Sequence, residues 1–334
     1  MDESDLIRLF LDAMPPDRGH SNAFFSSDAE ILDCDGGPML FTVDSFDRED
    51  HFPTGDAGTL GHNLAACTVS DIFASGGSVR FYGHSATIAE QWDAPYITAL
   101  SRGIADVLRE CGATFAGGDL GLSSRWHYTG IAFGHAERPV TRCGASPDDR
   151  LYVTGPLGAG NLLAAAELLP ARGTATIASK DLAFRFPLRH REARLVARHA
   201  SACIDTSDGL LRSLAILAEL NGTGYDIHSL PWLQPARMAM ESYGLPVELL
   251  AAGECGEYEL LCCIPPEREE QFLRDAASDG CSPFPIGRLA GSGRRLHGAS
   301  GFMTLDDYDL TARRFASRQE YLERMIDYFQ KKHA

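Results

Sequence analysis

The sequence predicts an α+β protein of two domains. At 334 residues the chain is longer than a single hydrophobic core ordinarily supports. Strand patterns and helical patterns alternate in short, mixed runs, which favours α/β sandwiches over a doubly wound sheet. A proline-containing turn at residues 146–149 separates two such series. We therefore expect a first domain at 1–147, a second domain at 148–304, and a charged, partly helical extension at 305–334.

The first domain begins with an amphipathic helix, predicted for residues 3–14, whose apolar face carries Ile7 and Phe10. Two strands joined by the turn Asp35-Gly36-Gly37 follow. Apolar residues recur at strand or helix spacing through the rest of this half. The predicted order after the first helix is strands at 29–33 and 38–45, a helix at 58–75, a strand at 81–89, a helix at 95–111, and strands at 113–119 and 127–136.

The second domain begins with a strand at 151–155, from which a glycine-rich turn leads into a helix at 160–169. The turn superficially resembles a phosphate-binding loop. No lysine and hydroxyl follow in register, so a strand–turn–helix junction is the better interpretation. The remaining predicted elements are helices at 190–200 and 208–221, and strands at 201–205, 258–264 and 283–289.

The composition excludes several classes of function. The formal net charge is -16, whereas nucleic acids and anionic membranes require a basic surface, so neither is an expected partner. The N-terminus is acidic and amphipathic rather than signal-like, and no apolar run approaches the roughly 20 residues of a membrane span. The nine cysteines include no C-x-x-C pair, which favours reduced core cysteines in a cytoplasmic protein over a structural zinc site.

Aspartates stand in apolar or glycine-rich settings at five places along the chain. Burying an isolated carboxylate is costly, so a repeated pattern of this kind requires cations to neutralise the cluster. Oxygen ligands suit magnesium, and magnesium held by scattered aspartates commonly accompanies nucleotide phosphates. The sequence therefore predicts a magnesium–ATP site. The residues concerned are Asp28, Asp44, Asp71, Asp119, and Asp208 with Asp205.

Asp44 closes its predicted strand, and Thr42 points to the same face of the sheet. A hydroxyl and a carboxylate on one face can share a metal ion. Seven residues further on lies His51, for which an ordinary loop histidine is the alternative interpretation. Asp71 lies on a predicted helix among small and apolar neighbours. A buried functional acid is favoured there over a helix-internal cap or a core hydrogen bond.

Asp119 follows Gly117 and Gly118, where a strand is predicted to end in a glycine turn. Glycines allow a ligand to approach the backbone closely, and the acid then faces that ligand. The G-G-D sequence is common in turns, so it becomes informative only beside Asp44 and Asp71.

The strongest local motif is C-I-D-T-S-D-G-L at residues 203–210. Asp205 ends an apolar strand, and either Ser207 or Asp208 is predicted to cap the helix that begins at Gly209. Anions bind favourably at such helix N-termini. The alternative is that Asp208 serves only as the N-cap.

Taken in order, these segments resemble the thiamine-monophosphate kinase family. That family stands in a superfamily with aminoimidazole ribonucleotide synthetase, selenophosphate synthetase and hydrogenase maturation factor E. The resemblance covers about residues 3–303. Its motifs are S-D-A at 27–29, T-V-D through H-F at 42–52, S-D at 70–71, G-G-D at 117–119, R-C-G-A at 142–145, V-T-G-P-L-G at 153–158, I-D-T-S-D-G-L at 204–210, G-E-Y-E-L-L at 256–261 and I-G at 286–287.

The resemblance implies two domains of the aminoimidazole ribonucleotide synthetase type and a homodimer in which the N-terminal sheets meet. It further implies several Mg2+ ions, ATP as co-substrate, and thiamine monophosphate or a similar phosphate-bearing molecule as acceptor. The implied catalytic residues are Asp44, Asp71, Asp119 and Arg142. The implied metal ligands are Asp28, Thr42, Asp44, Asp71, Asp119, Asp205 and Asp208; the nucleotide contacts are Gly117, Gly118, Asp119, Arg142 and Ser207; the acceptor contacts are His51, Glu257 and Phe302.

Four positions depart from the family pattern, at the metal periphery and on the acceptor side. They are Ser27, Asn63, Ser213 and Gly256. Two alternatives therefore stay open beside the kinase: a related ATP-dependent synthetase or cyclo-ligase, and a catalytically altered paralogue that binds ATP. A calcium-binding protein would require closely spaced ligands such as D-x-D-x-D-G, which the sequence lacks.

Overall fold

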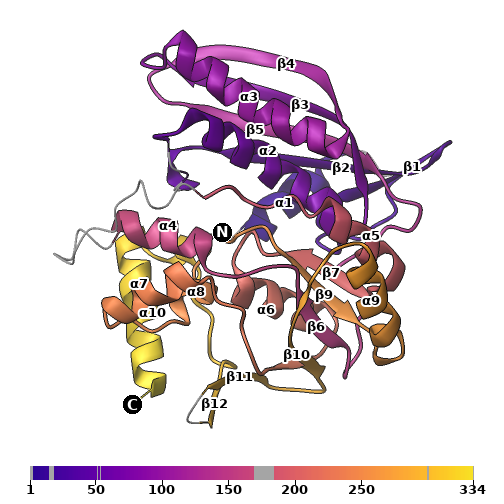
Figure 1. Cartoon of the computed structure of the whole chain (residues 1–334), viewed down its shortest axis with the longest axis vertical. Coiled ribbons are helices and arrows are strands. Elements are labelled where there is room, and N and C mark those ends of the chain that lie inside the picture. The colour runs from indigo at the N-terminus through magenta and orange to yellow at the C-terminus, as the bar shows by residue number, and fades with distance from the viewer. Residues whose placement is uncertain are drawn as a thin grey trace.

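A computed structural model of the chain describes residues 3–14, 19–50, 52, 54–168, 184–298 and 301–333. Two sheets organise these residues. One is built within the first 135 residues and the other from residue 150 onward, and each carries helices (Figure 1). This mixed arrangement confirms the predicted α+β fold class. No helix within the described ranges combines the length and apolar composition that crossing a membrane requires.

The N-terminal sheet has five strands in the order β1-β2-β5-β3-β4. All its neighbours pair antiparallel except β3 and β4, which run parallel because a helix connects them. The strands are β1 (Glu30–Cys34), β2 (Gly37–Phe46), β3 (Ser78–Ala89), β4 (Thr114–Ser123) and β5 (His127–His135). The helices of this half are α1 (Glu3–Asp12), the 3-10 turn η1 (Arg48–Asp50), α2 (Ala57–Ala74) and α3 (Ala94–Cys111).

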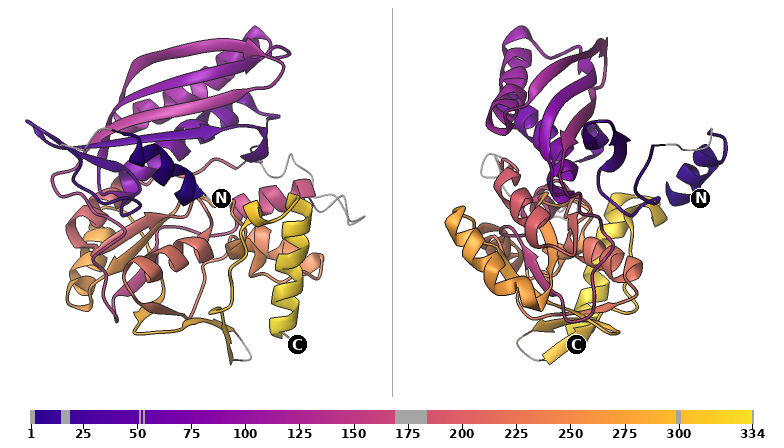
Figure 2. Two further views of the ribbon diagram at one scale, coloured as in Figure 1. Left: turned by 180° about the vertical axis from the view of Figure 1, so that it is seen from behind. Right: turned by 90° about the vertical axis from the view of Figure 1, so that its right-hand side faces the viewer.

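Helices α2 and α3 cover one face of this sheet, whereas α1 stands apart from both sheets (Figure 2). Asp56 begins α2 by accepting hydrogen bonds from the backbone of Gly58 and Thr59. A Cβ atom at Gly61 would lie 2.0 Å from the Leu100 carbonyl oxygen, so the glycine allows α2 and α3 to pack in close contact.

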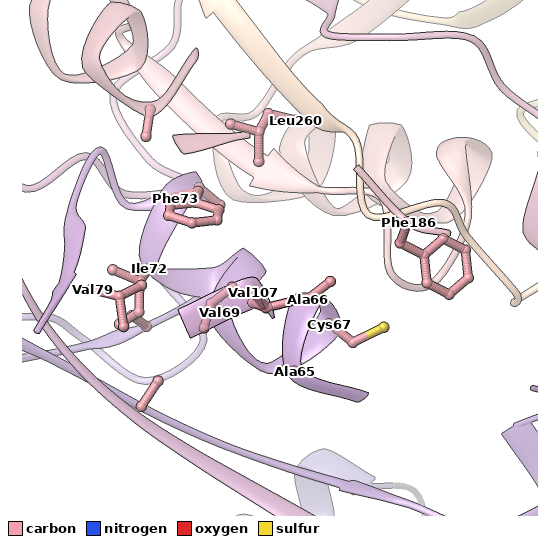
Figure 3. Packing of buried hydrophobic residues seen from close by; sticks show 14 of the residues in the cluster. Ala65, Ala66, Cys67, Val69, Ile72, Phe73, Val79, Val107, Phe186 and Leu260 are labelled. Carbon is pink, nitrogen blue, oxygen red and sulfur yellow. The ribbon is translucent and has the colours of Figure 1, made fainter. Parts of the chain in front are cut away.

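The α2 helix lies between the two sheets and is almost wholly buried. Ile72 of α2 lies beside Val79 of β3, and Phe73, Leu260 and Phe186 belong to the same hydrophobic core (Figure 3). The central helix therefore carries residues that face both halves of the molecule.

The C-terminal sheet has seven strands in the order β12-β11-β8-β10-β6-β9-β7. They are β6 (Arg150–Val153), β7 (Ala202–Asp205), β8 (Gly224–Ile227), β9 (Leu260–Ile264), β10 (Phe284–Ala290), β11 (Arg294–Gly298) and β12 (Gly301–Thr304). Two groups of helices pack on it, and their apolar residues fall into two separate clusters. The first group is α5 (His190–His199) and α9 (Pro266–Ser278). The second is α4 (Ala159–Leu168), α6 (Leu210–Leu220), α7 (Gln234–Ser242), α8 (Leu249–Ala252), the turn η4 (Ala312–Arg314) and α10 (Arg318–His333).

Strand β4 is longer than the strand predicted at 113–119. The strand expected to end in a glycine turn at 117–119 instead continues to Ser123 as β4. Gly117 adopts a φ of 122° where the register between β3 and β4 shifts, so the glycine accommodates an irregularity within the sheet rather than a turn at its end.

The N-terminal sheet carries large exposed apolar side chains on both of its sides. Val43 and Phe81, each at least 47% exposed, lie on the face that the helices leave open, beside Ile131 and Phe133 of β5. Phe115, Leu120 and Leu122 of the edge strand β4 are also exposed, but they pair with Tyr82, Ala86 and Ile88 and so lie on the helix-bearing side. Sheets with one face on a core normally present polar residues on the other. This sheet therefore presents an apolar surface suited to a partner.

Candidate functional site

Three carboxylates meet between the two sheets. Oxygen atoms of Asp28, Asp71 and Asp205 lie within 4.8 Å of one another. Asp28 precedes β1, Asp71 lies on α2, and Asp205 ends β7, so the cluster draws on both halves of the chain. Three acidic groups at this separation repel one another strongly unless a cation or protons intervene.

Arg142 and Thr42 support two of these carboxylates. The Arg142 Nη2 donates to Asp28 Oδ1 at 2.9 Å, and the Thr42 hydroxyl donates to Asp71 Oδ2 at 2.5 Å. The backbone N–H of Arg142 donates to the Ser26 carbonyl oxygen at 2.7 Å, which fixes the arginine beside Asp28. The contact between Thr42 and Asp71 joins β2 to the centre of α2.

Asp205 is held from two sides. Ser70 donates its hydroxyl to Asp205 Oδ2 at 2.6 Å, and Ser207 donates its hydroxyl to Oδ1 at 2.6 Å. Ser213 donates to the backbone carbonyl of Asp205 at 2.9 Å. The carboxylate therefore has a fixed orientation before any ligand binds.

The Ser207 contact corrects the predicted helix cap. The helix α6 begins at Leu210, with Gly209 in the N-cap position and no side-chain hydrogen bond there. Gly209 has a φ of 79°, and a Cβ atom on it would lie 2.1 Å from the Gly253 carbonyl oxygen. The N-cap position is therefore occupied by Gly209 and not by Ser207 or Asp208, and the Ser207 hydroxyl is bonded to Asp205.

Asp44 shares the helix-facing side of β2 with Thr42. Burial, together with the neighbouring charges of Asp205, Asp28 and Asp208, raises its pKa to about 8. Asp44 therefore belongs electrostatically to the cluster.

Burial also shifts two of the three clustered acids. Desolvation raises the pKa of Asp28 to about 6 despite the opposing charge of Arg142. Desolvation and the nearby Asp44 hold the pKa of Asp71 well above its usual range. Without a counter-ion the site retains protons at neutral pH. Buried oxygen donors of this kind are the chemistry that a hard divalent cation requires, so the donor set fits Mg2+.

A cavity of about 800 Å³ adjoins the cluster. Arg142, Asp205, Ser207 and Asp208 line one part of it, and Phe52 lines it from the N-terminal half. This volume suits a small molecule. Residues predicted from both halves of the sequence thus meet at one concave site.

The G-G-D residues lie elsewhere within the chain. Asp119 pairs with Ser85 across β3 and β4, and both are exposed. Asp44 and its neighbour across β5, Gly130, share the opposite side of the sheet, which α2 covers. Gly118 is three strands away from Asp44 in the sheet order. Asp119 therefore does not join the carboxylate cluster of its own chain.

The three residues predicted to contact the acceptor lie in different places. Phe302 lies on the edge strand β12, is 57% exposed, and packs on the His297 ring, outside the described lining of the cavity. This placement does not fit a role in stacking on a ligand at the cluster. Glu257 is buried and accepts a hydrogen bond from the Gly158 N–H at 2.5 Å, and desolvation raises its pKa to about 8. His51 lies outside the described residues.

Some residues of the site were not predicted from the sequence. Ser70 precedes Asp71 in V-S-D, and a second polar residue inside an apolar helix was the available hint. Arg313 and Arg318, from the C-terminal extension, line the cavity and have no motif to mark them.

Two of the four departures have a local packing role. Asn63 donates to the Phe184 carbonyl at 2.9 Å and accepts from the Phe186 N–H at 3.0 Å, which holds that segment over α2. A Cβ atom at Gly256 would lie 1.4 Å from the Thr206 carbonyl oxygen, so only glycine fits there.

Comparison with known proteins adds to this geometry. Residues 26–136 match the AIR synthase related protein, N-terminal domain, and residues 146–297 match the AIR synthase related protein, C-terminal domain. The thiamine-monophosphate kinase of Halobacterium salinarum is 35% identical over 269 residues, covering 78% of this chain and 88% of that protein. The thiamine-monophosphate kinase of Methanopyrus kandleri is 30% identical over 279 residues, covering 81% and 87% respectively. The solved structure of AaThiL complexed with AMPPCP and TMP matches with a TM-score of 0.71 and 25% identity, over 86% of this chain and 90% of that one.

Proposed function

This chain belongs to the thiamine-monophosphate kinase family of AIR synthase related proteins, and from that premise we propose that it phosphorylates thiamine monophosphate with ATP. The observation that carries the proposal is the convergence of Asp28, Asp71 and Asp205 beside a cavity large enough for small-molecule substrates. Relatives named for this activity cover most of the chain, which supports the choice of acceptor.

In the proposed reaction an oxygen of the acceptor's phosphate attacks the γ-phosphorus of ATP. The new P–O bond forms as the bond to the β-phosphate oxygen breaks, and ADP leaves. The nucleophile belongs to the substrate, so the protein needs no activated serine or cysteine, and catalysis rests on positioning and charge neutralisation.

We assign the magnesium ions to Asp28, Asp71 and Asp205, with Asp44 and Thr42 beside them. Bound magnesium would neutralise the phosphates of both substrates and orient their oxygens. The protein contributes fixed ligand directions, because Ser70 and Ser207 hold both oxygens of Asp205.

Arg142 is assigned to the transferring phosphate. Its Nη2 is bound to Asp28, whereas its buried Nε has no hydrogen-bond partner among the described residues. The guanidinium thus retains a donor directed by an existing ion pair. A charge-assisted bond from it to a phosphate oxygen would stabilise charge that develops during transfer.

We further propose a homodimer formed through the open face of the N-terminal sheet, where Val43 and Phe81 are exposed. Asp119 lies on the exposed side of the sheet, so this association would place it at an interface instead of in solvent. Residues 1–147 would then provide the interface together with Asp28 and Asp71 of the metal cluster, and residues 148–304 would supply Asp205 and complete the cavity.

The deciding experiment is ADP production with and without thiamine monophosphate, at varied magnesium. The proposal predicts that ADP release requires both, with thiamine diphosphate formed in equal amount. ADP release that does not depend on this acceptor would support a synthetase or cyclo-ligase. Tight magnesium–ATP binding without transfer to it would identify a non-catalytic paralogue.

A further inference from the structure

The C-terminal extension forms part of the cavity wall. Its residues begin beyond the family-model match, which ends at residue 297. Several of its side chains nevertheless line the same cavity as Asp205 and Ser207. Those used below are Arg313, Arg314, Arg318 and Tyr321.

The extension is a built part of the fold. Helix α10 buries Tyr321, Leu322, Met325, Ile326 and Phe329 in the C-terminal core, where it contacts α8 and α4. The yellow helix runs alongside these helices in both views of Figure 2. Burial of five such side chains is enough to fix the helix in place.

The extension also forms hydrogen bonds with the loop that precedes the G-E-Y-E-L-L motif at residues 256–261. The Tyr308 hydroxyl donates to the Ala252 carbonyl at 2.9 Å, and the Ala312 N–H donates to Glu254 at 3.0 Å. These contacts lie just before Gly256, which begins G-E-Y-E-L-L. The wall therefore stands next to the segment in which the family resemblance implies the acceptor contact Glu257.

Arg318 links this wall to the N-terminal half. The Arg318 Nη1 donates to the Glu49 carbonyl oxygen, and its Nη2 lies 3.6 Å from the Glu49 carboxylate. Glu49, Asp50 and Phe52 line the same cavity. Arg318 is thus the described contact that ties the extension to the turn η1.

Resting on the function proposed above, we propose that the C-terminal extension completes the acceptor side of the site and that Arg318 is its positioning residue. By holding η1 against α10, Arg318 sets the spacing between Phe52 and the wall formed by the extension. Arg313 adds positive charge to that wall, which favours an acceptor carrying a phosphate, whereas the charge of Arg314 is paired with Asp309 of the same lining. The hydroxyl of Ser207, the nucleotide contact that the resemblance implies, is bonded to Asp205.

The test compares Arg318→Ala and Arg318→Lys with Arg324→Ala in the full-length protein. Arg324 lies on the same helix, is exposed, and is outside the described lining of the cavity, so it is the matched control. We expect Arg318→Ala to raise KM for thiamine monophosphate by roughly three- to tenfold, the size of one net intramolecular hydrogen bond. KM for ATP and kcat should stay within about twofold, and the lysine variant should recover part of the loss.

An unchanged acceptor KM, or an equal rise in KM for ATP, would overturn the assignment. A measurement that needs no acceptor separates this inference from the proposed function. Hydrogen exchange of residues 46–50, measured with magnesium–ATP present, should accelerate in Arg318→Ala and not in Arg324→Ala. Unaltered exchange contradicts the positioning role even if the wild-type protein fails to use thiamine monophosphate. Arg318→Gln offers the same comparison should the alanine variant unfold.

Discussion

The hydroxyl of Ser70 donates a 2.6 Å hydrogen bond to the Asp205 carboxylate, across the junction of the two sheets. Ser70 lies on α2, and Asp205 ends β7. The next residue on the helix, Asp71, accepts from Thr42 of β2. Two consecutive residues of one helix thus orient the site's ligands from both halves of the protein.

Ser70→Ala should weaken the site without dismantling it. The variant leaves one oxygen of Asp205 without its buried donor, and removing such a supporting contact typically costs about 10- to 100-fold in metal affinity or activity. The measurement is the magnesium concentration for half-maximal ADP release. Ser101→Ala on α3 is the control, because that hydroxyl bonds only to its own helix at Ile97 and lies away from the site. Identical magnesium dependence in the two variants would argue against the role of Ser70.

Asp71→Asn should remove activity while preserving the fold. The amide keeps the shape of the side chain and its contact with Thr42 but cannot supply a negative oxygen to a cation. We expect magnesium-dependent ADP release to fall by at least roughly 100-fold. In metal-free buffer the thermal midpoint should stay level or rise, because a costly buried acid has been replaced by a neutral group. Asp106→Asn, an exposed acid on α3, controls for the general loss of charge.

Stability of the metal-free protein should fall as pH rises from about 4 to 8. Burial raises the pKa of Asp44 to about 8 and of Asp28 to about 6, whereas both titrate near 3.8 when unfolded. Between those values the folded state binds more protons than the unfolded state. Each such proton lowers the free energy of unfolding by about 1.4 kcal/mol per pH unit. Glu257, with a pKa raised to about 8, adds to the slope.

Urea unfolding at a series of pH values in EDTA measures this slope. Asp44→Asn should flatten it, and saturating magnesium should offset most of it, because a bound cation replaces the protons. Metal-free stability that rises with pH over this range would contradict the buried, uncompensated state of the cluster.

The acids of the site could be predicted because each stands in an unusual local setting. Asp71 has small and apolar neighbours on its helix, and Asp205 closes an apolar strand. Local pattern alone gave no reason to bring Asp28 together with them, since that contact depends on how two separate sheets pack against α2. The family resemblance is what grouped Asp28 with Asp71 and Asp205 as ligands of one metal site.

The positions of Asp119 and Phe302 could not be predicted from the sequence. The face to which Asp119 points depends on its register with Ser85, which follows an irregularity between Tyr82 and Gly83. Phe302 is placed by pairing with His297 on β11 at the far edge of the second sheet. Both outcomes rest on strand pairings that leave no mark in the residues themselves.

The apolar surface of the N-terminal sheet should be a dimer interface. Phe81 pairs with Phe133 across β3 and β5, and the Phe133 ring lies 5.0 Å from that of Phe41, so aromatic side chains adjoin on this surface. Burying such residues would stabilise association by roughly 1.5–3 kcal/mol for each large side chain. Phe81→Glu should therefore convert a dimer into a monomer in sedimentation velocity, with loss of turnover if the partner's surface supports the site. Met238→Glu, at an exposed position on α7, should sediment as the wild type does. A wild-type protein that stays monomeric at all concentrations would refute the interface and leave Asp119 without a role.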